Sequence, residues 1–500
     1  MTELTAHRFF EATKHPSPIR HAGVMDWTNR PAPFKVYQGR PRIPLPSPSR
    51  SRAPALDTIA PSRFEPSGTA PSFEDLSRML LYGAGVTHML PDGRPVHSFR
   101  TYASAGALYP VEVYVACADL PGLRAGVFHF APNEPAVVRL HEGDQRSLVA
   151  RASGLEPAVR SAPVVLILTG IPWRTAWKYT ERGYRHLFWD AGMIVANMLA
   201  LAAAAGQPAR LVLGFADREI ESLLGLDGPS EFPLALLAVG SGAPVEPSDD
   251  PPEAAAFSTG SLSRKVIEYP LVTEVNDAGR LETPQAVAAW RTKGAALPHP
   301  TDRGMDGLPS EPPLDDLEAV IRRRGSARVF AAGAISRPVL EDVLTRATRG
   351  IPTDYAPEGS RLVEPFLIAN QVNGLQPGAY VFRDGGFSLL REGNFRDQAA
   401  LLSLQQRLAA DAGATHFLTA DLGEVMGTLG DRGYRAAELE AGTVGGKMYL
   451  AAYAYRLGAT GLTFFDDPVT EFFLPESSGR SCLLVVALGQ SPRLRRERRR

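Results

Sequence analysis

The residue pair Lys178-Tyr179 could carry acid–base chemistry. Both side chains can exchange a proton, and burial or a neighbouring charge can move the pKa of such a group toward neutrality. The pair lies in the segment Trp177–Arg185, WKYTERGYR, which we expect to open a long helix. A helix start with a snorkelling lysine and tyrosine is the alternative interpretation. Lys178 and Tyr179 are therefore candidate catalytic residues, and a neighbouring ammonium group is expected to favour the tyrosinate form.

A second motif, Arg324-Gly-Ser326-Ala-Arg328, has the composition of a phosphate site. Two guanidinium groups and a hydroxyl at this spacing can surround one anion with charge-assisted hydrogen bonds. The motif follows a predicted helix at Leu314–Ile321, so arginines that only complement the end of that helix are the alternative. The motif is therefore a candidate phosphate cradle.

A loop of small residues, Tyr102–Pro110 with the sequence YASAGALYP, precedes a predicted strand. Small side chains let the backbone amides of Ser104, Ala105 and Gly106 approach a flat ligand closely, and the Ser104 hydroxyl can form a hydrogen bond. A tight turn that leads into the strand is the alternative interpretation.

These motifs belong to a sequence that is repeated. Arg182-Gly-Tyr-Arg185 recurs as Arg432-Gly-Tyr-Arg435, and further matches keep offsets between 249 and 253 in constant order. The repeat predicts two homologous domains. Each copy shows an apolar helix, a strand, a hairpin, a further strand, a long helix and a last strand, which is typical of an α+β fold. In the first copy the long helix is expected at Tyr184–Ala205.

The two copies differ in the motifs that they keep. The first has only Pro61-Ser-Arg-Phe64 where the second has the arginine cradle, and the second has APEGSR (356–361) where the first has the small-residue loop. The second copy also has Thr428-Leu429 in place of Lys178-Tyr179. We therefore expect one complete site for each chain, built from the loop of the first domain and the cradle of the second.

The domain organisation follows from the repeat and from composition. We expect an N-terminal extension at residues 1–60, a first domain at 61–242, a linker at 243–312, a second domain at 313–492 and an Arg-rich tail at 493–500. The extension, rich in Pro and Arg, is expected to wrap the surface or to be partly disordered. The linker is rich in Pro, Ser, Gly and Asp, and its segment KVIEYPLV (265–272) is expected to add a strand.

Composition excludes several classes of function. The 53 Lys+Arg and 54 Asp+Glu residues give a formal net charge of -1, which argues against nucleic acid as the main partner. No signal peptide is visible, and the most apolar stretch, 191–205, is too short to span a bilayer, so we expect a cytoplasmic protein. Two distant cysteines exclude a disulfide framework, and the histidine spacings indicate no metal site. AGTVGGKM (441–448) lacks the first Gly and the final Ser/Thr of a P-loop and is rejected as one.

The motifs together resemble the nitroreductase-like flavoprotein superfamily, and within it the SagB-type dehydrogenases and azoline oxidases of peptide natural-product pathways. The segments that carry the resemblance are EATKH (11–15), MLLYGAGVT (79–87), RTYASAGALYPVEVYV (100–115), KYTERGYRHLFWDAG (178–192) and RRRGSARVF (322–330). The resemblance implies an α+β fold with antiparallel-rich sheets flanked by helices, two such domains forming an intramolecular pseudo-dimer, and FMN held between them.

The resemblance also implies roles for single residues. The phosphate of FMN would be held by Arg324, Ser326 and Arg328, and the flavin would be contacted by Ser104, Ala105 and Gly106; Ala103 stands where the family usually has Pro. Leu462 and Thr463 would lie near the reactive nitrogen of the flavin, and Arg493 near its phosphate. Lys178 and Tyr179 would be catalytic.

Three functions remain open on the sequence. The first is an FMN-dependent dehydrogenase or oxidase that acts on an azoline or C–N bond of a small-molecule or modified-peptide substrate, with a biosynthetic enzyme as a possible partner. The second is an NAD(P)H-dependent nitroreductase or quinone reductase, which needs no Lys-Tyr pair. The third is a binding protein whose flavin site has decayed. The chain is expected to act as a monomer.

Overall fold

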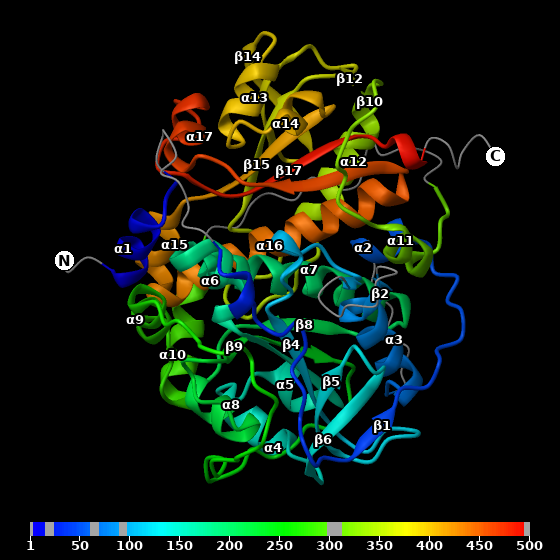
Figure 1. Ribbon diagram of the computed structural model, residues 1–500, viewed down its shortest axis with the longest axis vertical. Helices are drawn as coiled ribbons and strands as arrows, with labels where there is room; N and C mark the ends of the chain where they lie inside the picture. The colour runs from blue at the N-terminus through cyan, green and yellow to red at the C-terminus, as the bar shows by residue number, and fades with distance from the viewer. Residues whose placement is uncertain (1–3, 16–24, 61–69, 90–97, 298–312, 495–500) are drawn as a thin grey trace.

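Two β-sheets and two long helices between them organise the molecule. The computed structural model describes residues 4–15, 25–60, 70–89, 98–297 and 313–494. One sheet lies in each copy of the repeat, and the central helices are α7 (Gly183–Ala204) and α16 (Asp431–Ala454) (Figure 1). The structure confirms the expected α+β fold, with two domains arranged as an intramolecular pseudo-dimer.

The two sheets have the same strand order. In domain 1 the order is β6-β5-β4-β7-β9-β8, in domain 2 it is β14-β13-β11-β15-β17-β16, and neighbouring strands are antiparallel. The strands of domain 1 are β4 (Val111–Cys117), β5 (Gly126–Ala131), β6 (Ala136–Glu142), β7 (Val164–Gly170), β8 (Ala209–Val212) and β9 (Phe232–Val239). Those of domain 2 are β11 (Glu364–Ala369), β13 (Gly378–Arg383), β14 (Gly386–Glu392), β15 (Ala414–Ala420), β16 (Leu457–Leu462) and β17 (Ser481–Gln490). The hairpins, the central strands and the last strand match the expectation, whereas β8 and β16 had not been predicted.

Both faces of the sheet in domain 1 are covered. Along β7, Leu166 and Leu168 belong to the core shared with α7, whereas Val165 and Ile167 belong to a second cluster beneath the outer helices. A short, continuous apolar run is what a strand covered on both faces requires. The helices of domain 1 are α3 (Phe73–Ala84), α4 (Arg146–Ala152), α5 (Pro157–Ser161), α6 (Pro172–Tyr179), α7 and α8 (Asp217–Leu224). Those of domain 2 are α11 (Leu317–Arg323), α12 (Arg337–Thr348), α13 (Arg396–Leu402), α14 (Arg407–Asp411), α15 (Leu422–Leu429), α16 and α17 (Asp466–Phe472).

The helices α7 and α16 cross in direct backbone contact. A Cβ atom added to Gly192 would lie 2.4 Å from the Leu439 carbonyl oxygen, and one added to Gly442 would lie 2.5 Å from the Trp189 carbonyl oxygen. Only glycine fits such an approach, because the atoms that it meets belong to the other backbone. The segment 172–204 is long and apolar enough to cross a membrane, but 89% of its most apolar window is buried inside the protein, as in a core helix. The two helices therefore form the centre of the domain interface.

The segments outside the repeat contribute to the packing. Of the N-terminal extension, α1 (Thr5–Ala12) buries Phe9 and Phe10, β1 (Arg42–Pro44) pairs with β6, and α2 (Ala55–Ile59) lies against α7 and α16. The extension is thus part of the core as well as of the surface. Two short ladders complete the strands: β2 (Val86–Met89) pairs with β3 (Ser98–Arg100), and β10 (Ile335–Ser336) pairs with β12 (Val372–Asn373).

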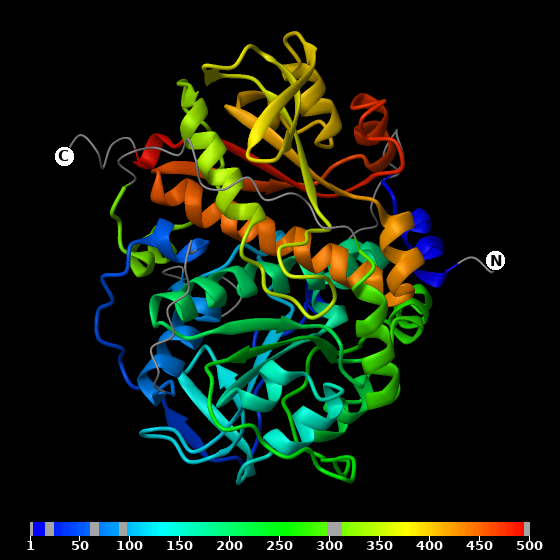
Figure 2. The ribbon, with the colours of Figure 1, turned by 180° about the vertical axis from the view of Figure 1, so that it is seen from behind.

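The linker contains helices and no strand at 265–272. The expected strand is wrong, because α9 (Pro270–Ala278) begins inside that segment at Pro270. A proline fits the first turn of a helix, where its missing N–H has no partner to lose. α10 (Pro284–Gly294) follows and packs against α15 of domain 2, and Figure 2 shows these helices along one side of the interface.

Candidate functional site at the domain interface

Lys178 and Tyr179 end a short helix of their own. They are the last residues of α6. The helix ends there because Thr180 has a φ of 50°, and a single 3-10 turn then leads into α7 at Gly183. The expectation that the pair opens the long helix is therefore wrong, because the pair ends the preceding helix α6. A positive φ is rare for a β-branched residue, so nothing in the sequence marked the break.

The Lys-Tyr pair converges on the loop of small residues. Gly106 has a φ of +64°, and a Cβ added to it would lie 2.9 Å from the Tyr179 hydroxyl and 3.2 Å from Lys178 Nζ. Two motifs of the first domain, 72 residues apart along the chain, thus meet at one point. A side chain at Gly106 would push both polar groups aside, so the glycine keeps this point open for a flat ligand.

The surroundings raise the pKa of Tyr179 and lower that of Lys178, which is the opposite of what the expected tyrosinate requires. Burial raises the pKa of Tyr179 to about 12, and the negative charge of Asp190 adds to the rise. Burial lowers the pKa of Lys178 below its ordinary value, and the positive charges of Arg30 and Arg328 lower it further. Tyr179 is therefore a neutral phenol that can donate a proton, and Lys178 is the group that more readily becomes a base.

Domain 2 brings its arginine motif to the same loop. The Arg324 guanidinium donates to the carbonyl oxygens of Arg100 and Thr101 at 2.9 and 3.0 Å, directly before the small-residue loop. Ser326 Oγ lies 3.2 Å from the Tyr449 hydroxyl. The exposed Arg328 is near enough for its charge to lower the pKa of Lys178. The motif of domain 2 therefore faces the loop of domain 1, although two of the N–H donors of Arg324 are already bonded to backbone carbonyls.

The other expected site residues of domain 2 lie along the same side. The Tyr449 hydroxyl accepts a hydrogen bond from the Gly461 amide at 2.6 Å, which places Leu462 and Thr463 beside Ser326. Leu462 is buried, and the Thr463 hydroxyl and carbonyl oxygen accept from the Gln406 side chain. Burial raises the pKa of Tyr453, which contacts Gly325, and the positive charge of the exposed Arg493 opposes this rise. Its charge therefore reaches the arginine motif.

A row of aromatic rings links the two domains behind the site. The rings of Tyr179 and His186 are 4.2 Å apart, those of His186 and Trp189 are 4.6 Å apart, and those of Trp189 and Phe464 are 6.4 Å apart. Phe464 follows the segment Leu462-Thr463 directly. The row thus holds the end of α6 in a fixed relation to the end of β16.

Two buried ion triads repeat across the interface. Asp466 of domain 2 binds Arg182 and Arg185 of domain 1 at 2.9 and 2.7 Å. In the other direction, Asp217 of domain 1 is bound by the repeated Arg-Gly-Tyr-Arg motif of domain 2, Arg432 at 2.6 Å and Arg435 at 3.0 Å. The motif that revealed the repeat is therefore an interdomain clamp.

The sequence alone assigned no role to this motif and did not identify Asp217 and Asp466 as its partners. Their signal was present, because Asp217 and Asp466 stand 249 residues apart, within the offsets of the repeat. Asp190 had also been missed, although it is an acidic residue on the predicted core helix, where an acid needs an explanation.

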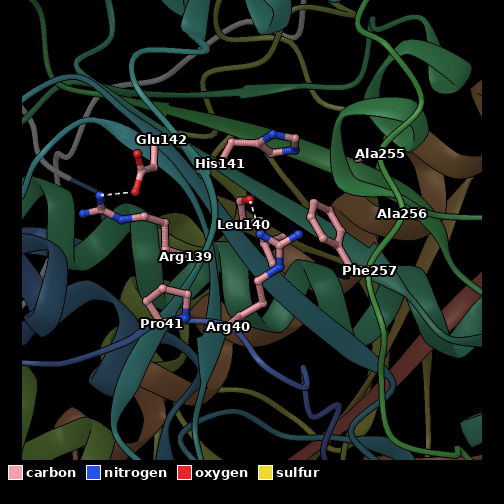
Figure 3. Close-up of a pocket in the computed structure, with 9 residues that line it drawn as sticks. All are labelled: Arg40, Pro41, Arg139, Leu140, His141, Glu142, Ala255, Ala256 and Phe257. Carbon is pink, nitrogen blue, oxygen red and sulfur yellow. Dashed lines mark hydrogen bonds and ion pairs between the residues drawn. The ribbon is translucent and has the colours of Figure 1, made fainter.

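A surface groove of domain 1 does not include these residues. It has a volume of about 440 Å³ and lies at the sheet edge between β6 and the linker, where Arg40, Arg139, His141 and Phe257 are among its lining (Figure 3). Its arginines already contact neighbours: Arg40 lies over the Phe257 ring at 4.6 Å, and Arg139 is 4.0 Å from Glu142. Among the described residues, no three His, Cys, Asp or Glu side chains are grouped to hold a metal ion.

The donor set at the interface suits a flat ligand that carries a phosphate. Guanidinium groups and a hydroxyl from domain 2 match an anion, and an open glycine with adjacent backbone amides from domain 1 matches a planar ring. The hydroxyls of Tyr102 and Thr101 are buried beside the loop without a partner among the described residues. Pro61–Phe64, the counterpart of the cradle in the first copy, lies outside the described residues.

Comparisons with known proteins agree with this architecture. The model of the nitroreductase family matches residues 67–241 and 321–490, one match for each domain. A putative nitroreductase from Anabaena variabilis has a solved structure that superposes with a TM-score of 0.76 at 25% identity, over 98% of this chain and all of the other. The tandem arrangement is thus shared with a solved protein.

Two curated relatives match parts of the chain. The putative nitroreductase MJ1384 of Methanocaldococcus jannaschii is 32% identical over 169 residues, which are 34% of this chain and 80% of the relative. The microcin B17-processing protein McbC of Escherichia coli is 29% identical over 140 residues, which are 27% of this chain and about half, 52%, of the relative. The second match supports the likeness to the SagB-type subfamily. With both of its domains matched by the family model, this chain belongs to the nitroreductase family.

Proposed function

We propose that this protein is an FMN-dependent dehydrogenase or oxidase of the SagB type, which acts on an azoline ring or C–N bond of a peptide-derived substrate. The observation that carries the proposal is the convergence of Lys178 and Tyr179 over Gly106, opposite the arginine motif of the other domain. The similarity to a microcin-processing protein supports a modified peptide as the substrate class. Such a substrate is the product of a ring-forming enzyme, so a biosynthetic partner enzyme belongs to the proposal.

The residues at the interface divide the work. Arg324, Ser326 and Arg328, with Arg493 close by, would hold the phosphate of FMN, and the Ser104–Gly106 loop would face its ring, with Leu462 and Thr463 on the side of domain 2. A bound FMN supplies the capacity to accept two electrons as a hydride. A flavin ring beneath the Lys-Tyr pair would lie where the protein can place the substrate against that ring and exclude water from the ring.

Lys178 and Tyr179 have different roles in this proposal. When an azoline becomes an azole, one ring carbon loses a hydride and its neighbour loses a proton. Lys178 Nζ takes the proton, since its lowered pKa makes the neutral amine accessible. Tyr179 remains a phenol because its pKa is about 12, and it orients the ring by donating a hydrogen bond. This assignment replaces the expected tyrosinate base.

The test begins with the absorbance spectrum of the purified protein in the flavin bands. Under anaerobic conditions, an azoline-containing peptide should bleach the flavin, and analysis of the product should find the azole. Lys178→Ala and Tyr179→Phe should keep their flavin but slow turnover by roughly 10²- to 10⁴-fold, the usual contribution of a general acid or base. Thr428→Ala, at the position of Lys178 in the other domain, is the matched control. Unchanged turnover in both site variants would refute their roles.

A second candidate function is an NAD(P)H-dependent nitroreductase, favoured by the 32% identity to a putative nitroreductase over most of that relative's length. NADPH would then bleach the flavin, whereas the azoline peptide would have no effect. Lys178→Ala would leave the reduction by NADPH unchanged, because hydride transfer from a nicotinamide needs no base at this position. A colourless protein that binds no added FMN would contradict both functions.

A further inference from the structure

Asp190 is a buried carboxyl directly behind the small-residue loop. It lies on α7 and is 2% exposed. Its carboxyl accepts hydrogen bonds from the Ser104 side chain and, at Oδ1, from the Ala105 amide at 3.3 Å, whereas its Oδ2 is buried without a hydrogen-bond partner among the described residues. An ionised carboxylate left half-paired in this environment is unfavourable, since a buried charge needs partners for its oxygens.

The matching acid in the other half of the interface is fully paired. Glu440 occupies the position of Asp190, 250 residues later on α16. Its Oε1 accepts from the amides of Leu362 and Val363 at 2.6 and 2.9 Å, and its Oε2 accepts from the Tyr355 hydroxyl at 3.0 Å. Tyr102, which corresponds to Tyr355, is 1% exposed, and its hydroxyl has no partner among the described residues. The repeat thus shows how this acid looks when it is purely structural, and Asp190 departs from it.

We propose that the neutral carboxyl of Asp190 is a positioning residue for the proposed reaction: it holds the Ser104–Gly106 loop under the Lys178–Tyr179 pair, and its ionisation disables the site. The connection is short, because Ala105 binds Asp190 and the next residue, Gly106, lies against Tyr179 and Lys178. The expected effect of Asp190 on turnover rests on the proposed function. Its expected effect on the stability of the folded protein is independent of that function.

The titration of Asp190 falls in an accessible range. Burial raises its pKa to about 8, although hydrogen bonds from Ser104 and Ala105 and the positive charge of Arg100 act in the opposite direction. Among the described residues, the charged and titratable groups that face it are Arg100 of β3, Tyr102 and Tyr109 of the loop, and Tyr179 of α6. The three tyrosines all have raised pKa values, so Asp190 is the group among them that ionises near pH 8.

The first test uses the protein without substrate. Because the folded pKa of Asp190 lies above the unfolded value, the folded state binds the extra proton between about pH 4 and 8, and this contribution to stability is lost as the pH rises through that range. Asp190→Asn keeps the acceptor for Ala105 and cannot ionise. The melting temperature of Asp190→Asn, relative to the unsubstituted protein, should therefore rise between pH 5 and pH 8 and then level off. A difference that does not change with pH overturns the proposal.

The second test measures kcat/KM for the azoline peptide, or for NADPH if only that substrate bleaches the flavin. The unsubstituted enzyme should lose activity above about pH 8, at least fivefold by pH 9, whereas Asp190→Asn should keep a flat profile there. Asp190→Ala should be slow at every pH, because the loop loses its anchor. Glu440→Gln is the matched control and should keep the alkaline decline. If Asp190→Asn declines as the unsubstituted enzyme does, the positioning role is wrong; if neither substrate is turned over while the melting temperatures behave as expected, only the proposed function fails.

Discussion

The two halves of the interdomain interface share one framework and differ in what fills it. In both, an Arg-Gly-Tyr-Arg motif of one domain clamps an aspartate of the other, with Asp466 in the half that contains Lys178 and Asp217 in its counterpart. Only the first half, which we call the open half, has the Lys-Tyr pair, the small-residue loop and the arginine motif. The framework therefore does not by itself make a site, and what fills each half decides its role.

The counterpart, which we call the closed half, is joined by direct bonds between the domains. Asp354 of domain 2 accepts from the amides of Leu213 and Gly214 of domain 1 at 2.8 and 3.0 Å. The Leu211 amide also donates to the Pro352 carbonyl oxygen at 2.8 Å, so a segment of domain 2 extends the sheet edge at β8. These contacts occupy the backbone groups that correspond, at the offset of 249, to Leu462 and Thr463 in the open half.

The open half has a shorter, uncharged residue where the closed half has the aspartate. Thr101 takes the place of Asp354, and its buried hydroxyl has no hydrogen-bond partner among the described residues. The linker strengthens the closed half further, because Arg291 of α10 binds Asp354 at 3.1 Å. The comparison teaches that duplication let one half become a structural joint while the other kept its polar groups for a ligand.

The largest effect on flavin binding is expected when the open half is made to resemble the closed one. Thr101→Asp brings a carboxylate toward the amides of Leu462 and Thr463. The carboxylate would also lie beside Arg324 and offset the positive charge that is proposed to bind the phosphate. We expect the flavin content of the purified protein to fall at least tenfold, measured by absorbance after denaturation. An added carboxylate repels a phosphate and competes for its donors, which gives a loss on the order of 1.4 kcal/mol or more.

The reverse change in the closed half supplies the control. Asp354→Thr removes the partner of the Leu213 and Gly214 amides and of Arg291, so it should lower the melting temperature without changing the flavin content. Circular dichroism checks that Thr101→Asp is folded. Full flavin occupancy in a folded Thr101→Asp protein would show that the open half is not the cofactor site.

The two ion triads allow the framework and the site to be separated. Asp217→Asn and Asp466→Asn each leave two buried arginines without their counter-charge, which costs about 3–5 kcal/mol for a buried pair. Chemical denaturation should find similar losses for both, because the triads are equally buried. Turnover of the folded protein should fall only in Asp466→Asn, since Arg182 lies three residues after Tyr179. Equal losses of turnover in both variants would mean that the halves are coupled and that the comparison is too simple.

The sequence predicted the fold because the repeat constrained it twice. The apolar runs at 164–169 and 234–239 became β7 and β9, and the small-residue loop and the arginine motif, more than 200 residues apart, do face each other. The short strands β8 and β16 escaped notice because four to six residues carry little pattern.

The rest of the site depends on contacts that only the folded chain makes. Both copies have an acid at the position of Asp190, and only the three-dimensional partners reveal that Glu440 is paired on both oxygens while Asp190 is not. The direction of the pKa of Tyr179 follows from burial, which a neighbouring lysine in the sequence could not reveal. Thr101 and Asp354 likewise gain meaning only from the amides that they face.

The smallest effect on stability is expected at Lys447, an ionisable group buried beside the interface in domain 2. It stands where domain 1 has the neutral Asn197, is 1% exposed, and donates to the Arg349 carbonyl oxygen. Burial, with the positive charge of Arg349, lowers its pKa to about 7. The folded protein therefore binds fewer protons than the unfolded chain between about pH 7 and 10, and its stability rises with pH over that range.

Lys447→Met removes this pH dependence and the penalty for a buried charge. We expect the free energy of unfolding to increase by about 1–3 kcal/mol at pH 7, and the gain to shrink as the pH approaches 10. Thermal melts of both proteins from pH 6 to pH 10 measure it, with the exposed Lys293→Met as the control that should show no such trend. A gain that is the same at every pH would show that Lys447 is held as an ammonium ion. The two halves would then differ in charge at this position as well as in their pairing.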